Sequence, residues 1–172
     1  YNTTASYNTG VGYHVLQVNT TGDRNTAVGY RSLASNTTGT TLVAMGSEAL
    51  RDNTTGTGST AVGWAALAIN TTGSHNVAVG QSSLLYNSTG YFNTSVGSFT
   101  MDANTTGASN TALGYSALSA NSTASNNTAI GRNASLKTTD EVNGEYYISL
   151  KNNLTLNNGD ECIIKHVFID TI

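Results

Sequence analysis

The stretch NTTGDRNTAVGYRSLAS, residues 19–35, is repeated with small changes along most of the chain. Eight such units run from Asn2 to Lys137 without insertion or deletion, with the consensus N-T-T-G-x-x-N-T-A-V-G-x-x-x-L-x-x. Equivalent residues recur every 17 positions, so each unit stacks on its neighbour in one fixed way. The glycine of the AVG triplet, for example, recurs as Gly12, Gly29, Gly46, Gly63, Gly80, Gly97, Gly114 and Gly131.

The composition of the unit predicts β-structure. Helical repeats need about 30 residues or more, and the unit is rich in Thr, Val, Asn and Gly, which disfavour helix. NTAVG alternates as a short strand does, and Asn-Thr-Thr-Gly supplies turn residues. We therefore predict an all-β fold: a single-stranded parallel β-solenoid (β-roll) of eight 17-residue coils, each with two strands and two turns. At about 4.8 Å per coil, the rod is about 40 Å long.

Equivalent positions of the units line up as columns. We number the opening Asn as unit position 1 and predict that the Val column (position 10) and the Leu column (position 15) form the core. By alternation the Ala column (position 9) then faces the other side of the strand. The Ala column is Gly10, Ala27, Ala44, Ala61, Ala78, Ser95, Ala112 and Ala129; the Val column is Val11, Val28, Met45, Val62, Val79, Val96, Leu113 and Ile130; the Leu column is Leu16, Leu33, Leu50, Leu67, Leu84, Met101, Leu118 and Ser135.

The composition excludes several classes of partner. Net charge is −3 and only 10% of residues are charged, which argues against nucleic acid and anionic membranes as partners. No apolar run of about 20 residues predicts a membrane span. The single cysteine, Cys162, excludes an internal disulfide and a multi-cysteine metal site. No nucleophile–base pair, phosphate loop or metal-ligand spacing is found, so we predict no enzyme, no catalytic or metal site and no cofactor.

At these residues the sequence resembles the head repeats of YadA-like trimeric autotransporter adhesins and related repeats of phage and environmental surface-fibre proteins. Their units carry an N-S/T-x-A-hydrophobic-G core, matched here by NTAVG, NVAVG, NTALG and NTAIG within residues 2–137. The units of the adhesin heads are usually shorter than the unit of this chain. The resemblance implies a left-handed parallel β-roll, a location outside the cell or on a cell or virion surface, and an adhesive or structural role.

The repeat stops after residue 137, so we divide the chain into a solenoid, 1–137, and a C-terminal strand or hairpin segment, 138–172. YYISLK and LTL are typical of strands, and NNGD at residues 157–160 is a hairpin signal. One interpretation is a cap on the chain's own solenoid. The other is a joining element that pairs with the open first coil of the next copy. The assembly candidates, apolar on both faces of the last stretch, are Ile163, Ile164, Val167, Phe168, Ile169 and Ile172.

The opening asparagines match the N-glycosylation pattern N-x-S/T. One interpretation is a ladder of covalent glycans along one edge of the rod; the other is that Asn-Thr-Thr-Gly is turn chemistry, with asparagines bonding along a ladder. Further matches occur at Asn93, Asn126, Asn133 and Asn153. The candidates that open the units are Asn2, Asn19, Asn36, Asn53, Asn70, Asn87, Asn104 and Asn121.

Three further patterns allow more than one interpretation. Threonine columns at unit positions 2, 3 and 8 suggest an ice-binding array, although the usual T-x-T pairing is missing. The column after the glycine carries Tyr13, Tyr30, Trp64 and Tyr115, which suit either sugar stacking or a subunit contact. The three histidines, His14, His75 and His166, form no cluster and are interpreted as surface or packing residues.

These patterns predict a structural subunit of an extracellular fibre or filament. Its partners are copies of itself, joined head to tail through the C-terminal strand and the open N-terminal coil, with glycans as a further expectation. The alternative is a trimeric adhesin or tail-fibre head that binds a cell surface or glycan, and the third is an ice-binding solenoid.

Overall fold

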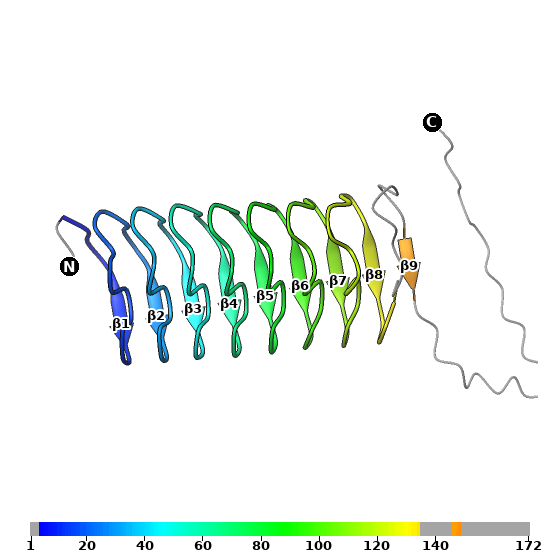
Figure 1. Ribbon diagram of the computed structural model, residues 1–172, viewed down its shortest axis with the longest axis horizontal. Coiled ribbons are helices and arrows are strands. Elements are labelled where there is room, and N and C mark those ends of the chain that lie inside the picture. Colours follow the sequence, from blue (N-terminus) through cyan, green and yellow to red (C-terminus); the bar gives the residue numbers. More distant parts are fainter. Residues whose placement is uncertain (1–3, 135–145, 149–172) are drawn as a thin grey trace, which may run out of the picture.

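The computed structural model describes residues 4–134 and 146–148, which form a parallel β-solenoid (Figure 1). All strands belong to one sheet, follow one another in sequence order, and pair in parallel with their neighbours. No helix long and apolar enough to cross a bilayer occurs in this described part of the chain. The strands are β1 Thr9–Val11, β2 Thr26–Val28, β3 Val43–Met45, β4 Thr60–Val62, β5 Val77–Val79, β6 Thr94–Val96, β7 Thr111–Leu113, β8 Thr128–Ile130 and β9 Tyr146–Ile148.

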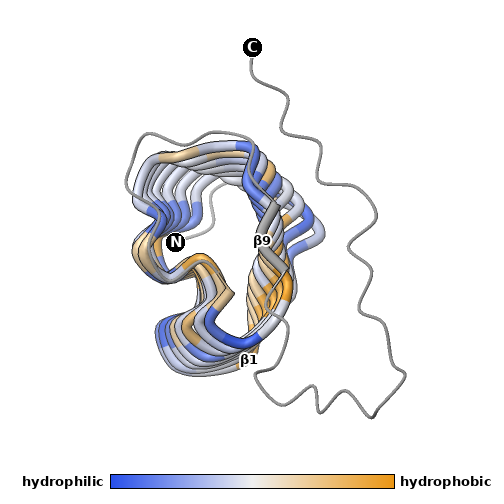
Figure 2. The backbone as a smooth tube through the Cα atoms, turned by 90° about the vertical axis from the view of Figure 1, so that its right-hand side faces the viewer, coloured by the Kyte–Doolittle hydropathy of each residue, from blue (hydrophilic) through white to orange (hydrophobic). Residues whose placement is uncertain are grey.

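The register of the strands confirms the predicted coil length. Val28 pairs with Val11 on one side and with Met45 on the other, and each partner lies one full repeat away in the sequence. The same step holds through β8, and viewed along the axis the coils superpose (Figure 2). The last step differs, because the partner of Thr128 in β9 is Tyr146, one position beyond the repeat period. A strand whose sequence does not follow the repeat can therefore pair with the last strand of the repeats.

Each described coil has one strand, so the prediction of two strands per coil was wrong. Besides the glycine after the strand, three positions of the coil have a positive φ, as at Arg24 (φ 56°), Arg31 (φ 54°) and Leu33 (φ 51°) of the second coil. A strand requires φ near −120°, and these residues turn the chain instead. The same positions are left-handed in the other described coils, which keeps the path of the coil constant.

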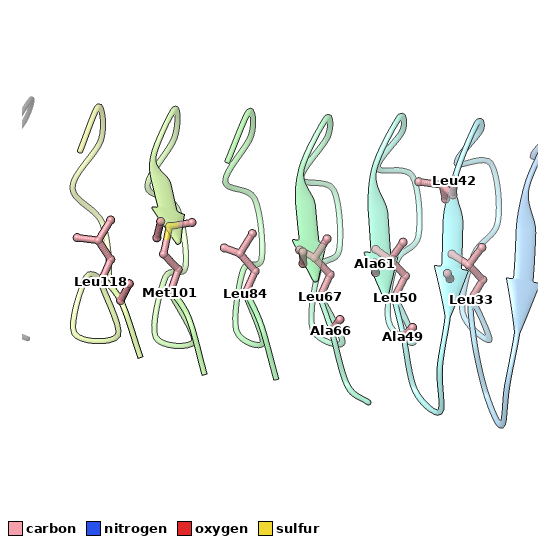
Figure 3. Close-up of a cluster of buried hydrophobic side chains, with 14 of the residues drawn as sticks. Leu33, Leu42, Ala49, Leu50, Ala61, Ala66, Leu67, Leu84, Met101 and Leu118 are labelled. Atoms are coloured by element: carbon pink, nitrogen blue, oxygen red, sulfur yellow. The ribbon is translucent and has the colours of Figure 1, made fainter. Parts of the chain in front are cut away.

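The core contains the Leu column, as predicted, together with the Ala column. Leu33, Leu50 and Leu67 are fully buried and stand one above another along the axis (Figure 3). In β2 to β8 the middle strand residue is buried; Ala61 of β4, for example, has no exposed surface. The interior is thus a stack of leucines that packs against a stack of methyl groups.

The prediction that the Val column lies in the core was wrong, because the alternation is reversed. Val11, Met45 and Leu113 of that column are 59%, 45% and 48% exposed. The coil is narrow at this point: in the first coil, where Val15 replaces the Ser, Ala or Thr of the others, a Cβ built at Gly10 of the Ala column would lie 3.1 Å from Val15 Cγ1. Ala or Ser occupies the buried middle position from β2 to β8, and the larger side chain of each strand faces outward.

Candidate functional site

Two ladders of buried asparagines run along the inside of the solenoid wall. In the first, at unit position 1, Asn36 Nδ2 donates to Asn19 Oδ1 at 2.8 Å and to the Gly39 carbonyl at 3.0 Å. The pattern repeats in each coil up to Asn121, whose Oδ1 has no hydrogen-bond partner among the described residues. The ladder asparagines from Asn19 to Asn121 are fully buried or within 1% of it.

The second ladder, at unit position 7, was not predicted from the sequence. Asn25 Nδ2 donates to the Gly39 carbonyl of the next coil at 2.9 Å, and Asn25 Oδ1 accepts from the Leu42 backbone N–H at 3.0 Å. The Gly39 carbonyl therefore accepts from both ladders. Leu42 and Ser59 interrupt the second ladder, which resumes at Asn76. The sequence signal was the second asparagine of the consensus, six positions after the first.

The rest of the NTTG motif is explained by the same wall. Thr37 of position 2 donates its hydroxyl to the Thr54 carbonyl of the next coil at 3.0 Å. A Cβ on Gly22 would collide with the Gly39 carbonyl and lie 2.6 Å from Asn19 Oδ1. By contrast the threonines of position 3, such as Thr38, are exposed in every described unit.

The burial of the first ladder changes the expectation for glycans. A sugar on Asn70 Nδ2 would replace a hydrogen that donates to Asn53 Oδ1 or to the Gly73 carbonyl, in a place without access to solvent. A folded coil therefore has no room for glycans on the buried candidates from Asn19 to Asn121. Asn93 is buried too, whereas Asn126 and Asn133 are exposed. Asn2 and Asn153 lie outside the described residues, as do the assembly candidates between Ile163 and Ile172.

The aromatic column forms exposed contacts between coils. The rings of Tyr13 and Tyr30 stack with centroids 5.9 Å apart and an interplanar angle of 4°. Trp64 is 53% exposed, and Arg132 lies over the ring of Tyr115 at 5.7 Å. The aromatic side chains of this column thus cover neighbouring coils and also leave apolar ring surface exposed.

The described histidines and the ion pairs of Arg51 lie in separate places on the solenoid. His14 Nδ1 lies 2.6 Å from Gln17 Oε1, and His75 stacks on Phe92 in another part of the coil. Arg51 pairs with Glu48 and Asp52, and these carboxylates raise the pKa of its guanidinium. No group of three His, Cys, Asp or Glu side chains suited to a metal lies within the described residues.

The outward sheet face is a regular surface that runs along the solenoid. It consists of the strand residues at unit positions 8 and 10, the first and third residue of each of β1 to β8. We refer to these residues as the outward face. Thr26 and Val28 of β2 are half-buried on it, and Met45 of β3 and Leu113 of β7 are exposed.

One edge of the first strand, β1, faces away from β2. Thr9 N–H donates to the Asn25 carbonyl and the Val11 carbonyl accepts from Gly29 N–H, so both residues bond toward β2. Because successive residues of a parallel strand bond to opposite sides, the N–H and C=O of Gly10 point away from β2. Among the described residues no strand pairs with this edge.

Comparisons with protein-family models, curated proteins and solved structures gave no match for this chain. The solenoid implied by the resemblance to adhesin heads is present, but no family match identifies the chain as a YadA-like head.

Proposed function

We propose that the protein is a structural subunit of an extracellular fibre or filament, in which copies join head to tail. The observation that carries the proposal is that, within the described residues, no strand pairs with the edge of β1 that faces away from β2. Backbone groups such as the N–H and C=O of Gly10, which point away from β2 at the end of a regular stack, are a template for a further strand. A head-to-tail contact that does not close on itself extends into a filament.

The strand β9 supports the proposal that another chain segment can fill such a position. Tyr146–Ile148 follows the last repeat and does not match the consensus, yet it pairs in register with β8. Pairing in this solenoid therefore depends on the backbone more than on the repeat sequence. In the proposed joint, residues 161–172 of one copy, which include Ile163 and Phe168, add a strand beside β1 of the next.

The repeat geometry suits a mechanical role. The two asparagine ladders and the threonine hydroxyls of position 2 add side-chain hydrogen bonds between coils to those of the backbone. Such a wall resists bending and stretching along the axis, because each coil is tied to its neighbours at several points around its circumference. Stiffness along the axis is the property that a fibre subunit requires.

A matched pair of variants at one residue tests the joint. Gly10→Pro removes the backbone N–H that points away from β2. Gly10→Ala keeps this N–H and introduces the residue that most other coils have at this position. We expect the Pro variant, and a chain that lacks residues 161–172, to remain as short rods in negative-stain images. The wild type and the Ala variant should form long fibres. Long fibres from the Pro variant, or none from the wild type, would contradict the proposal.

The alternative function, a trimeric adhesin or fibre head, is favoured by the exposed aromatic column. Tyr30 and Trp64 present ring faces of the kind that stack on sugars. An adhesin head of this kind forms compact trimers and does not elongate, so the mass distribution of the wild-type protein distinguishes it from a fibre.

A further inference from the structure

The outward face carries no charge. From Thr9 in β1 to Ile130 in β8, its two columns contain only Thr, Val, Met, Leu and Ile. The charged residues of the repeats, such as Arg24 and Glu48, lie at other unit positions. Together with the aromatic column two residues farther along each coil, the outward face holds most of the exposed large hydrophobic side chains of the described residues. A regular uncharged surface that exposes large apolar side chains is typical of an interaction site.

We infer that the outward face is a lateral contact between copies of this chain, in which two solenoids pack side by side. The axial period identifies the partner. Apolar side chains recur on the face once per coil through eight coils without a break. A partner can fill the spaces between successive side chains along the whole face only if it has the same rise per coil. A second copy of this chain has the same rise per coil because it has the same repeats.

The chemistry of the two faces is compatible with such packing. Sheets pack face to face about 10 Å apart when the facing side chains are small or medium-sized and uncharged. The Thr and Val side chains of β2, β4 and β6 meet this condition, and Val43 and Val77 replace threonine in two other strands. The aromatic column would lie along the border of the contact, where Tyr and Trp are enriched in protein interfaces.

The area of the face indicates how strong the contact is. Eight rungs at about 4.8 Å give a length of about 38 Å, and the two columns plus the aromatic border give a width of about 15 Å. A pair would then bury roughly 1,100 Å² in total, close to the lower limit for a stable interface. Single subunits should therefore pair weakly. In a fibre the same contact repeats along the axis, so lateral pairing becomes strong when the head-to-tail assembly of the proposed function also occurs.

Charged substitutions on the face test the inference, with controls in the same coils. The test variant combines Met45→Lys and Leu113→Lys, both at exposed positions of the outward face. The control combines Thr38→Lys and Thr106→Lys, which add the same charge to the third and seventh coils at exposed positions away from the sheet. Circular dichroism on the full chain verifies that all variants fold. Fibre width and length are measured separately by negative-stain imaging, and mass by analytical ultracentrifugation.

We expect wild-type assemblies to be at least two solenoids wide. The test variant should form assemblies of single width and unchanged length, and the control should match the wild type. A wild type of single width, or a test variant that retains the wild-type width, overturns the inference. So does an equal loss of width in test and control, since the effect would then come from net charge.

The two proposals fail in different ways. Loss of length in the Gly10→Pro variant concerns the head-to-tail joint, and loss of width with unchanged length in the variant with Met45→Lys and Leu113→Lys concerns the lateral contact. In the Gly10→Pro variant, the lateral inference still predicts a weak, concentration-dependent dimer that the two Lys substitutions abolish. A strict monomer that shows thermal hysteresis, lost on Met45→Lys and Leu113→Lys, would overturn the inference and show that the face binds ice.

Discussion

Asn53 Nδ2 donates to Asn36 Oδ1 at 2.8 Å, one coil earlier in the solenoid, and to the Gly56 carbonyl at 3.1 Å in its own coil. One amide thus joins neighbouring coils and holds its own turn. Because Asn53 is fully buried, water cannot replace either bond.

Replacement of Asn53 by alanine should destabilise the protein by about 2–4 kcal/mol, because it leaves Asn36 Oδ1 and the Gly56 carbonyl buried without this donor. Chemical denaturation measures the change. Thr38→Ala is the control, since Thr38 is exposed and has no positive φ, and its effect should stay within about 0.5 kcal/mol. Equal effects at the two positions would show that the ladder does not stabilise the fold.

Gly63→Ala should be strongly destabilising. Gly63 has φ +134°, and a Cβ there would lie 2.6 Å from the Gly80 carbonyl oxygen of the next coil. Backbone must move to accept the methyl group, so we expect a loss of about 2–3 kcal/mol or more. Gly58→Asn is the control, because other coils have larger residues at its position and only the His75 side chain must move. A melting temperature for Gly63→Ala that equals the wild-type value would contradict this.

Thr41→Asn should stabilise the protein. Thr41 is β-branched and has φ 58°, a backbone conformation that asparagine adopts more readily. We expect a gain of about 1 kcal/mol, seen as a higher melting temperature. Thr40→Asn, at the neighbouring residue without a positive φ, should give no comparable gain. If both variants gain equally, relief of backbone strain is not the cause.

Asp102→Asn should stabilise the protein at neutral pH. Burial raises the pKa of the Asp102 carboxyl, and its Oδ1 has no hydrogen-bond partner among the described residues. The folded state therefore holds the proton more tightly than the unfolded state, and stability falls as pH rises from the ordinary aspartate pKa to the raised folded value. Because asparagine does not titrate, the Asp102→Asn variant does not lose stability in this way as pH rises. Its advantage in thermal unfolding at pH 7 should shrink below the ordinary aspartate pKa, and an equal advantage at low pH would contradict the assignment.

The folded protein should carry no N-linked glycan on the buried ladder. When the chain is produced in a host with N-glycosylation, we expect peptides that contain Asn70 to have unmodified mass, while Asn126 remains open to the transferase. Peptide mass spectrometry of the folded fraction measures both. A glycan on Asn70 in protein with wild-type circular dichroism would show that the wall can open at the ladder.

The sequence by itself determined the coil length, the parallel register and the all-β class. A constant period without insertions places Val28 beside Val11 and Met45 whatever the cross-section of the coil. It also identified the Leu column as core, because leucine recurs at that position in a unit that is otherwise largely polar.

Only the tertiary structure decided which side of the strand faces inward. Alternation separates Ala27 from Val28, but both are apolar, so the pattern has no polar face to mark the outside. The answer depends on the space left inside the coil by the leucines and asparagines, and from β2 to β8 that space holds only Ala or Ser at the middle of the strand. The role of the asparagines was open for the same reason: Asn-Thr-Thr-Gly suits an exposed turn as well as a buried one, and only the stacked coils show that Asn36 and Asn53 share a hydrogen bond in the interior.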